Sequence, residues 1–177
     1  MRLLPVLCVI VLCAPLPVHG QGKEHVAVTA KLSQDAVTAG GEMRGALLVT
    51  VGSGWHINSA SPVDENLVGT AASFSPAGGL AVSGVRYPGG IAKKFAFSNE
   101  PLSVYEGTVV ILFTITAAAA LAPGDHMLPV DVSYQACNND ICLAPSSLRV
   151  AIPVRVMPQG AVPMHINNEL FSGDSER

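Results

Sequence analysis

Short runs of β-branched and other apolar residues recur along most of this 177-residue chain, and glycine and proline separate them. The separators have the composition of turns, as in Pro76-Ala77-Gly78-Gly79 and Pro88-Gly89-Gly90. Many short strands between such turns are typical of an all-β sandwich or barrel, and we find no pattern for a helix of three turns. We therefore predict strands at His25–Leu32, Met43–Val51, Trp55–Asn58, Thr70–Phe74, Leu80–Tyr87, Leu102–Tyr105, Thr108–Thr116, Met127–Ala136 and Ser147–Val156.

Alternation of apolar residues marks two of these runs as half-buried strands. The apolar residues of one run share even numbers and are Leu128, Val130, Val132, Tyr134 and Ala136. The even-numbered residues from Leu148 to Val156 form a similar series. Because alternate residues of a strand point to the same face, both series are predicted to face the core. The run Thr108–Thr116 is apolar at both parities, so we expect it to be buried on both faces.

The first twenty residues have the pattern of an export signal. The positive Arg2 precedes an apolar run that prolines interrupt, and a cleavage position lies before Gln21. Cys8 and Cys13 lie inside this run and would be removed with it. No later run is long enough for a membrane helix. We therefore expect an exported protein that is soluble after signal removal and in which disulfides can form.

These features predict a simple organisation of the chain. We expect a signal peptide at 1–20, a single domain at 21–157 and an extended tail at 158–177. The mature chain of about 155 residues is long enough to bury a real core, so it does not need a disulfide merely to fold.

Charge and motifs exclude several classes of function. Without Arg2, nine basic and thirteen acidic residues remain, and they are scattered rather than gathered into a basic surface. We therefore expect no nucleic-acid partner. The mature chain has no Gly-x-Ser-x-Gly elbow of a hydrolase and no glycine loop that opens a nucleotide-binding helix. We also predict no cofactor.

Cys137 and Cys142 are the two cysteines of the mature chain, and four residues separate them. The intervening asparagines and aspartate favour turn geometry, so a hairpin is the natural connection. Cysteines that face each other across an antiparallel pair lie within reach of a disulfide. Cys137 continues the polar odd-numbered face of its strand, which predicts that its sulfur points to solvent or to a cleft if no bulge intervenes.

Three uses of this cysteine pair remain open on the residues alone. A structural staple is one, although closing so short a loop contributes only about 2 kcal/mol in the chain-entropy model. Reversible thiol–disulfide exchange is the second, since an accessible sulfur can be attacked by another protein's thiolate. The third is a metal site completed by His56, His126 or His165, for which the spacing offers no specific pattern. We therefore expect no metal.

Three segments together resemble a known family. The first is the cysteine segment, from Tyr134-Gln135-Ala136-Cys137 to Cys142-Leu143-Ala144-Pro145. The second is Gly54-Trp55-His56-Ile57-Asn58, and the third runs from Tyr87 through Lys94-Phe95-Ala96-Phe97 to Gly107. Their order and spacing are similar to the N-terminal periplasmic domain of the thiol:disulfide interchange protein DsbD. The best-known members carry one more residue between the cysteines, so the loop here is tighter.

The resemblance implies an immunoglobulin-like β-sandwich, in a single domain, whose cysteines cycle between dithiol and disulfide. It implies a cap loop within Phe95–Glu100, with Phe95 or Phe97 as an aromatic lid over the sulfurs. Trp55 and Tyr105 would border the site, although core packing is an equally simple role for such aromatic residues. Glu100 and Asp140 would be carboxylates near the sulfurs that disfavour a thiolate by like-charge repulsion, or ordinary solvated side chains.

The function that the resemblance implies is thiol–disulfide exchange, as an oxidoreductase of the protein-disulfide reductase type. A membrane reductant would pass electrons through Cys137 and Cys142 to thioredoxin-like periplasmic proteins, which serve disulfide isomerases and cytochrome c maturation. Cys142 would face the partner and Cys137 would resolve the mixed disulfide. The sequence ends at Arg177 without a membrane domain, so we expect a separate membrane electron donor. The alternative is an exported binding module in which the disulfide is only structural.

Overall fold

The structure is a computed structural model of the chain, and it describes residues 22–23, 25–63, 66–75, 77–95 and 98–172. Its strands form three sheets. The main sheet contains, in spatial order, β1 (Gly22–Lys23), β2 (Val26–Leu32), β4 (Glu42–Val51), β10 (Thr108–Ala117) and β7 (Leu80–Arg86). The second sheet contains β3 (Val37–Thr38), β13 (Ser146–Met157), β11 (Gly124–Tyr134) and β6 (Ala71–Phe74). The small sheet contains β12 (Ala136–Cys137), β5 (His56–Asn58), β9 (Leu102–Tyr105) and β8 (Ile91–Lys93).

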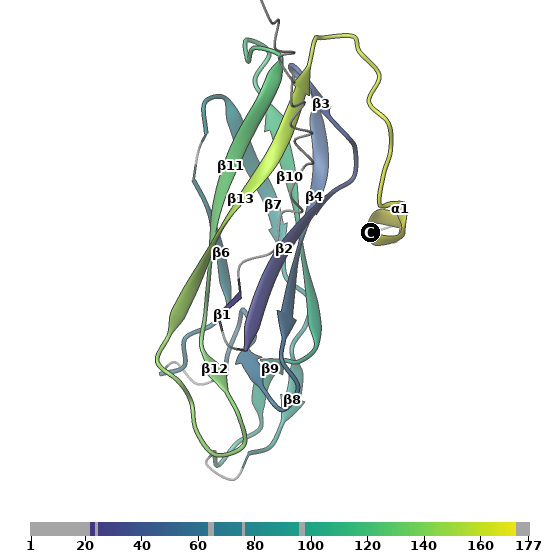
Figure 1. Cartoon of the computed structure of the whole chain (residues 1–177). Helices are drawn as coiled ribbons and strands as arrows, with labels where there is room; N and C mark the ends of the chain where they lie inside the picture. The colour runs from purple at the N-terminus through teal and green to yellow at the C-terminus, as the bar shows by residue number, and fades with distance from the viewer. Residues whose placement is uncertain (1–21, 24, 64–65, 76, 96–97, 173–177) are drawn as a thin grey trace, which may run out of the picture.

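The main and second sheets pack face to face as a sandwich, and the small sheet lies at one end of it. Figure 1 shows β8, β9 and β12 gathered at the lower end, below the long strands β11 and β13. All strand pairs are antiparallel except that of β3 with β13, within the residues that the structure describes. The all-β sandwich predicted from the sequence is therefore confirmed.

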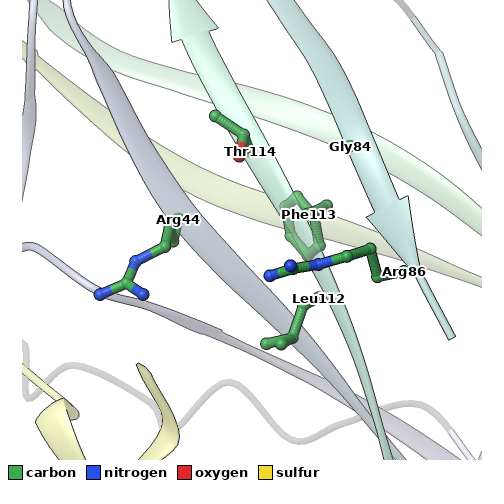
Figure 2. Close-up of a pocket in the computed structure, with 6 residues that line it drawn as sticks. All are labelled: Arg44, Gly84, Arg86, Leu112, Phe113 and Thr114. Carbon is green, nitrogen blue, oxygen red and sulfur yellow. The ribbon is translucent and has the colours of Figure 1, made fainter. Parts of the chain in front are cut away.

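The outer face of β10 differs from the prediction of burial on both faces. Val110 and Leu112 are only half-buried, because none of the described strands forms a further layer over this side of the main sheet. A hollow of about 280 Å³ opens here beside Leu112 and Thr114. Figure 2 shows the side chain of Arg86 extending from β7 across β10, whereas the side chain of Arg44 on β4 points away from β10. A long side chain thus covers part of this face.

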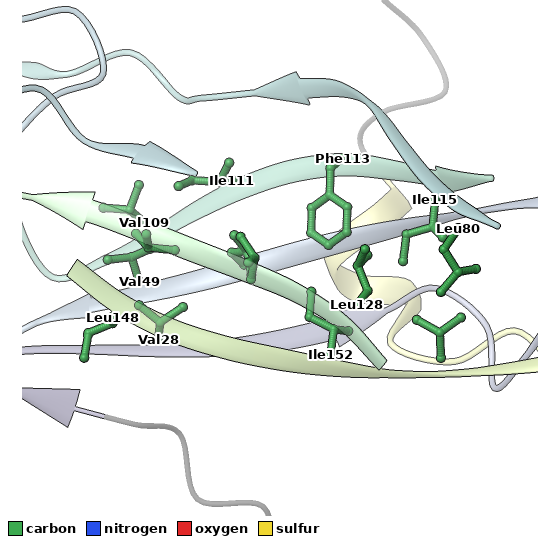
Figure 3. Packing of buried hydrophobic residues seen from close by; sticks show 14 of the residues in the cluster. Val28, Val49, Leu80, Val109, Ile111, Phe113, Ile115, Leu128, Leu148 and Ile152 are labelled. Carbon is green, nitrogen blue, oxygen red and sulfur yellow. The ribbon is translucent and has the colours of Figure 1, made fainter. Parts of the chain in front are cut away.

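The inner faces of the two large sheets make one continuous hydrophobic core. The even-numbered residues of β11 and β13 lie in it, as the alternation predicts. Figure 3 shows Leu128 and Ile152 of the second sheet pointing toward Phe113 and Ile115 of the main sheet. The ring of Phe113 fits only because Gly45 lies directly opposite it in the register of β4 and β10. A Cβ atom at Gly45 would come within 2.3 Å of that ring.

The chain passes from the second sheet to the small sheet at Gln135. Up to Tyr134 the chain pairs with β13, and from Ala136 it pairs with β5 instead. The predicted strand Met127–Ala136 is therefore two strands, β11 and β12. The short β8, which pairs with β9, is not predicted from the sequence, and neither are β1 and β3.

The described part of the tail, 158–172, returns along the edge of β2 and ends in the single turn of α1 (Asn168–Phe171). Backbone bonds between Ser33 and Ile166 and between Asp35 and Met164 hold it. Phe171 is buried, and Arg44 donates to its carbonyl oxygen at 2.8 Å. The described residues contain no helix with the length and apolar character needed to cross a membrane.

Candidate functional site

Cys137 and Cys142 are joined by a disulfide across a tight hairpin, with their Cα atoms 4.0 Å apart. They form a bridge between backbone bonds from Asn138 N to Ile141 O and from Leu143 N to Ala136 O. The side chain of Asn138 accepts bonds from the amides of Asp140 and Ile141, at 2.8 and 2.9 Å. The asparagine therefore shapes the turn, as its residue type predicts, and the hairpin expected from the spacing is present.

The two cysteines differ in their exposure. Cys142 lies on the exposed side of the hairpin, whereas Cys137 is 1% exposed. The conditional prediction that the Cys137 sulfur points to solvent or to a cleft, from the polar face of an unbroken strand, therefore does not hold. Its condition was an uninterrupted strand, and the change of sheets at Gln135 breaks that condition. Ala136 and Cys137 are both buried, since they lie in the small sheet rather than at the end of β11.

Strand β5 brings His56 to the buried cysteine. His56 and Cys137 are directly opposite each other in the antiparallel pair of β5 and β12. Opposite residues of such a pair project to the same face of a sheet. His56 is 1% exposed, and its Nε2 atom has no hydrogen-bond partner among the described residues. Burial lowers the pKa of His56, and Lys93 acts in the same direction while Glu106 opposes it.

Phe95 covers this face of the small sheet. Its ring stacks on the ring of His56, with centroids 4.2 Å apart, and it packs with Leu102 and Val104 in a small hydrophobic cluster. Lys93 lies over the ring, 5.6 Å from its centroid. Phe95 is 4% exposed, so the first residue of the expected cap loop is a buried anchor rather than part of a free loop. Phe97, the other candidate lid, lies outside the described residues.

The remaining described part of the cap loop closes on itself. Lys94 donates to the carbonyl oxygen of Asn99, and Ser98 donates through its backbone to the carbonyl of Phe95. The hydroxyl of Ser98 also bonds to the carbonyl of Glu100 at 2.7 Å. These bonds are local, since each joins two residues of the same loop.

The structure separates the predicted border residues between two faces of the small sheet. Tyr105 is opposite Ile57, one residue away from His56, so it projects to the other face and joins the main core. Its hydroxyl donates to the carbonyl oxygen of Pro88 at 2.8 Å. Trp55 also packs against the main core and stacks on His25 at 3.7 Å. Neither aromatic residue therefore lies on the face that carries Cys137.

Trp55 nevertheless lines a pocket beside the cysteine hairpin. The pocket has a volume of about 460 Å³, and Lys93, Glu106 and Asn139 also line it. Lys93 and Glu106 form an ion pair there. The two carboxylates expected near the sulfurs are both exposed to solvent, Glu100 on the cap loop and Asp140 in the hairpin turn.

Gln135 ties the hairpin to the small sheet, and sequence reasoning does not find this role. Its side chain accepts from Asn58 at 3.2 Å and donates to the carbonyl of Leu143 at 3.2 Å. Asn58 is buried, and it also donates to the carbonyl of Val68. The sequence also does not predict that His56 lies beside Cys137. It does indicate that His56 and Asn58 lie on the same face of one strand, because they are two residues apart.

The arrangement provides a bonded pair of sulfurs with unequal access. Cys142, at the surface, is open to a foreign thiol, whereas Cys137 is buried in β12 beside His56. Within the described residues, no three His, Cys, Asp or Glu side chains gather closely enough to hold a metal ion.

Three solved structures show distant similarity to the chain. The N-terminal periplasmic domain of ScsB from Proteus mirabilis is 19% identical with a TM-score of 0.49, over 77% of this chain and 49% of that one. The chain thus spans about half of the length of that relative. The DsbD N-terminal domain of Neisseria meningitidis, in the reduced form, is 15% identical with a TM-score of 0.44, over 72% of this chain and 85% of that one. The GAE domain of yeast GGA1 is 13% identical with a TM-score of 0.45, over 76% and 98%.

Comparison with the curated proteins gives no significant match. A family model gives a clear one, since the model for the N-terminal region of the thiol:disulfide interchange protein DsbD matches residues 23–153. That range includes both cysteines, β5 and the cap loop. The chain therefore belongs to the family of DsbD N-terminal domains, which are periplasmic immunoglobulin-like β-sandwiches of thiol–disulfide exchange.

Proposed function

We propose that this domain carries reducing equivalents through Cys137 and Cys142, from a membrane reductant to thioredoxin-like periplasmic proteins. The observation that carries the proposal is the unequal access of the two bonded sulfurs, with Cys142 exposed and Cys137 buried. A staple needs no such asymmetry, whereas a carrier needs one sulfur that a foreign thiolate can reach. The family of the chain supports the same chemistry.

The asymmetry also assigns the order of events in this proposal. In the oxidised domain, a thiolate of the electron donor attacks Cys142, and Cys137 leaves as the thiolate. A second thiol of the donor releases the reduced domain. In the reduced domain, Cys142 attacks the disulfide of the acceptor, and Cys137 then resolves the mixed disulfide. Two electrons pass in each half of the cycle, and the domain returns to its starting state.

The surface around Cys142 suits a docking partner. Ile141 and Leu143 flank Cys142 and are exposed, the former at 54%. Contiguous exposed apolar side chains are typical of interaction sites. We propose that a thioredoxin-like partner covers these residues and that the cap loop, Phe95–Glu100, moves aside as it docks. Glu100 and Asp140 then lie at the rim, where they disfavour a free thiolate on Cys142 until the partner arrives.

We further propose that 1–20 is a signal peptide that exports the chain to the periplasm, that 21–157 is the exchange domain and that 158–177 is a tail. Export places the cysteines in a compartment where a disulfide persists until a specific reductant reaches it.

The test of the proposed function is a trapping experiment with single-cysteine variants. Cys137→Ser leaves the exposed Cys142 without its resolving partner, so it should accumulate a mixed disulfide with an oxidised thioredoxin-fold protein. Cys142→Ser leaves the buried Cys137 and should trap little. Mass spectrometry under non-reducing conditions measures both species. Absence of a trapped species with Cys137→Ser would leave the disulfide as a structural bridge in an exported binding module.

A further inference from the structure

His56 is a buried, titratable side chain that the exchange chemistry described so far does not use. It lies directly opposite Cys137 on the neighbouring strand, and both side chains project to the face that Phe95 covers. Opposite residues of an antiparallel pair have Cβ atoms about 5 Å apart. An imidazole and a thiol on such positions are within reach of each other once the Cys137 sulfur is no longer bonded to Cys142.

Two further observations distinguish His56 from an ordinary core residue. Its Nε2 atom is buried and has no hydrogen-bond partner among the described residues. A buried polar atom without a partner is energetically unfavourable, so a partner present in another state of the protein is the simplest reason to keep it. The disulfide is one state, and in the dithiol state the Cys137 thiol supplies a new donor on the same face.

The charged groups around His56 are few in the described part of the chain. Lys93 of β8 and Glu106 after β9 act on it in opposite directions, and they pair with each other. Lys94 and Glu100 on the cap loop and Asp140 in the hairpin are exposed to solvent. The ring is therefore held neutral by its burial, which leaves one ring nitrogen able to accept a proton.

We propose that Nε2 of His56 accepts the proton of the Cys137 thiol in the reduced domain and so generates the thiolate that resolves the mixed disulfide. This inference rests on the proposed function for its biological setting, and it assigns a role to a residue of the same site.

The resolving step transfers one proton and breaks one sulfur–sulfur bond for each one that it forms. After Cys142 has attacked a partner's disulfide, Cys142 Sγ is bonded to one partner sulfur. The Cys137 thiol gives its proton to His56, and the Cys137 thiolate attacks Cys142 Sγ. The bond between Cys142 and the partner breaks, the partner sulfur leaves with the electron pair, and it takes a proton from the imidazolium. The domain ends as the disulfide with His56 neutral, and the partner ends as the dithiol.

A small aromatic disulfide, dithiobis-nitrobenzoate, separates this step from the first. Each reduced domain should release one coloured thiolate when Cys142 attacks and a second when Cys137 resolves. Glutamine can accept a hydrogen bond but cannot take up a proton at neutral pH. In His56→Gln we therefore expect the second phase of thiolate release to slow by about 100-fold and the first phase to stay unchanged. The second phase should also lose its plateau near neutral pH and rise continuously with pH.

The matched control is His165→Gln, which changes an exposed histidine of the tail and should leave both phases unaltered. A second measurement needs no variant. In the wild-type domain, the nitrogen resonance of His56 Nε2 should move on reduction, because the atom gains a hydrogen bond from the thiol. Equal second-phase rates and pH profiles in wild type and His56→Gln would overturn the proposal, and so would an unchanged resonance.

These outcomes are distinct from those of the trapping experiment. Cys137→Ser captures a thioredoxin-fold partner without any need for His56. If capture fails while the second phase with the aromatic disulfide still depends on His56, the carrier function is wrong and the role of His56 stands. If capture succeeds and the second phase ignores His56, the carrier function stands and the role of His56 is wrong.

Discussion

The ring of Phe95 lies almost parallel to the ring of His56, at an angle of 20° and a centroid distance of 4.2 Å. This stacked pair joins the cap loop to the strand that faces Cys137. The described remainder of the loop bonds mainly to itself. We therefore expect access to the buried Cys137 to be controlled at Phe95, the anchor of the loop, more than by bonds along the loop.

Phe95→Ala should open the site. Full burial of a phenylalanine side chain contributes about 2 kcal/mol, and losing it raises the open population by about 30-fold. We expect reduction of the disulfide by dithiothreitol to accelerate by a comparable factor, measured by quenching with an alkylating agent and mass spectrometry. Phe95→Leu is the matched control, since it keeps apolar bulk and should accelerate reduction much less. Identical rates in all three proteins would mean that Phe95 does not control access.

The stability of the domain should fall as the pH drops below the ordinary histidine pKa of 6.5. Burial lowers the pKa of His56 in the folded state, so the unfolded state takes up a proton there that the folded state does not. Stability rises with pH wherever the unfolded state binds more protons, so it is fully present above about pH 6.5 and declines toward the lower folded pKa. Urea unfolding from about pH 7.5 to about pH 5 measures this loss.

Two histidine variants test whether His56 causes this pH dependence, and two aspartates can be excluded as its cause. His56→Phe should remove the decline, and His165→Gln should keep it. Asp125 and Asp131 have pKa values held below 3.8 by hydrogen bonds from Arg155 and Arg149. Their contribution is lost only as the pH falls through those lower values, outside this window. A decline of equal size in wild type and His56→Phe would assign the effect to another group.

Gly45→Ala should destabilise the sandwich without touching the cysteines. The added methyl would meet the Phe113 ring at 2.3 Å, and that ring is buried and packed at 4.7 Å against Phe74. Forcing extra atoms into a packed core costs about 1–3 kcal/mol. Gly89→Ala is the control, because nothing lies within 4 Å of its added methyl. Equal denaturation midpoints for the two variants would show that the ring relaxes freely.

Local patterns in the sequence predict much of this fold. The even-numbered residues of β11 and β13 face the core because a single hydrophobic face dictates which way each strand turns. Asn138 and its neighbours similarly predict the hairpin, since their side chains bond to the backbone close by. In each case the information lies within a few consecutive residues.

Pairing between distant segments explains what the sequence does not predict. Nothing near Gln135 indicates that the chain leaves β13 there and joins β5, because the reason lies in its bonds with Asn58 and Leu143. That change of partner buries Cys137 and places His56 beside it. Strand β8 has no alternation of its own and forms against β9. The tail likewise depends on contacts with Ser33 and Arg44, far away in the chain.

The hairpin keeps its shape by means other than the sulfur–sulfur bond. The backbone bond from Leu143 to Ala136, the side chain of Asn138 and the brace from Gln135 do not involve the sulfurs, so we expect them to persist when the disulfide is reduced. Reduction would then change the chemistry of the hairpin and leave its backbone in place. Such a domain would begin each redox cycle with its sulfurs already in position.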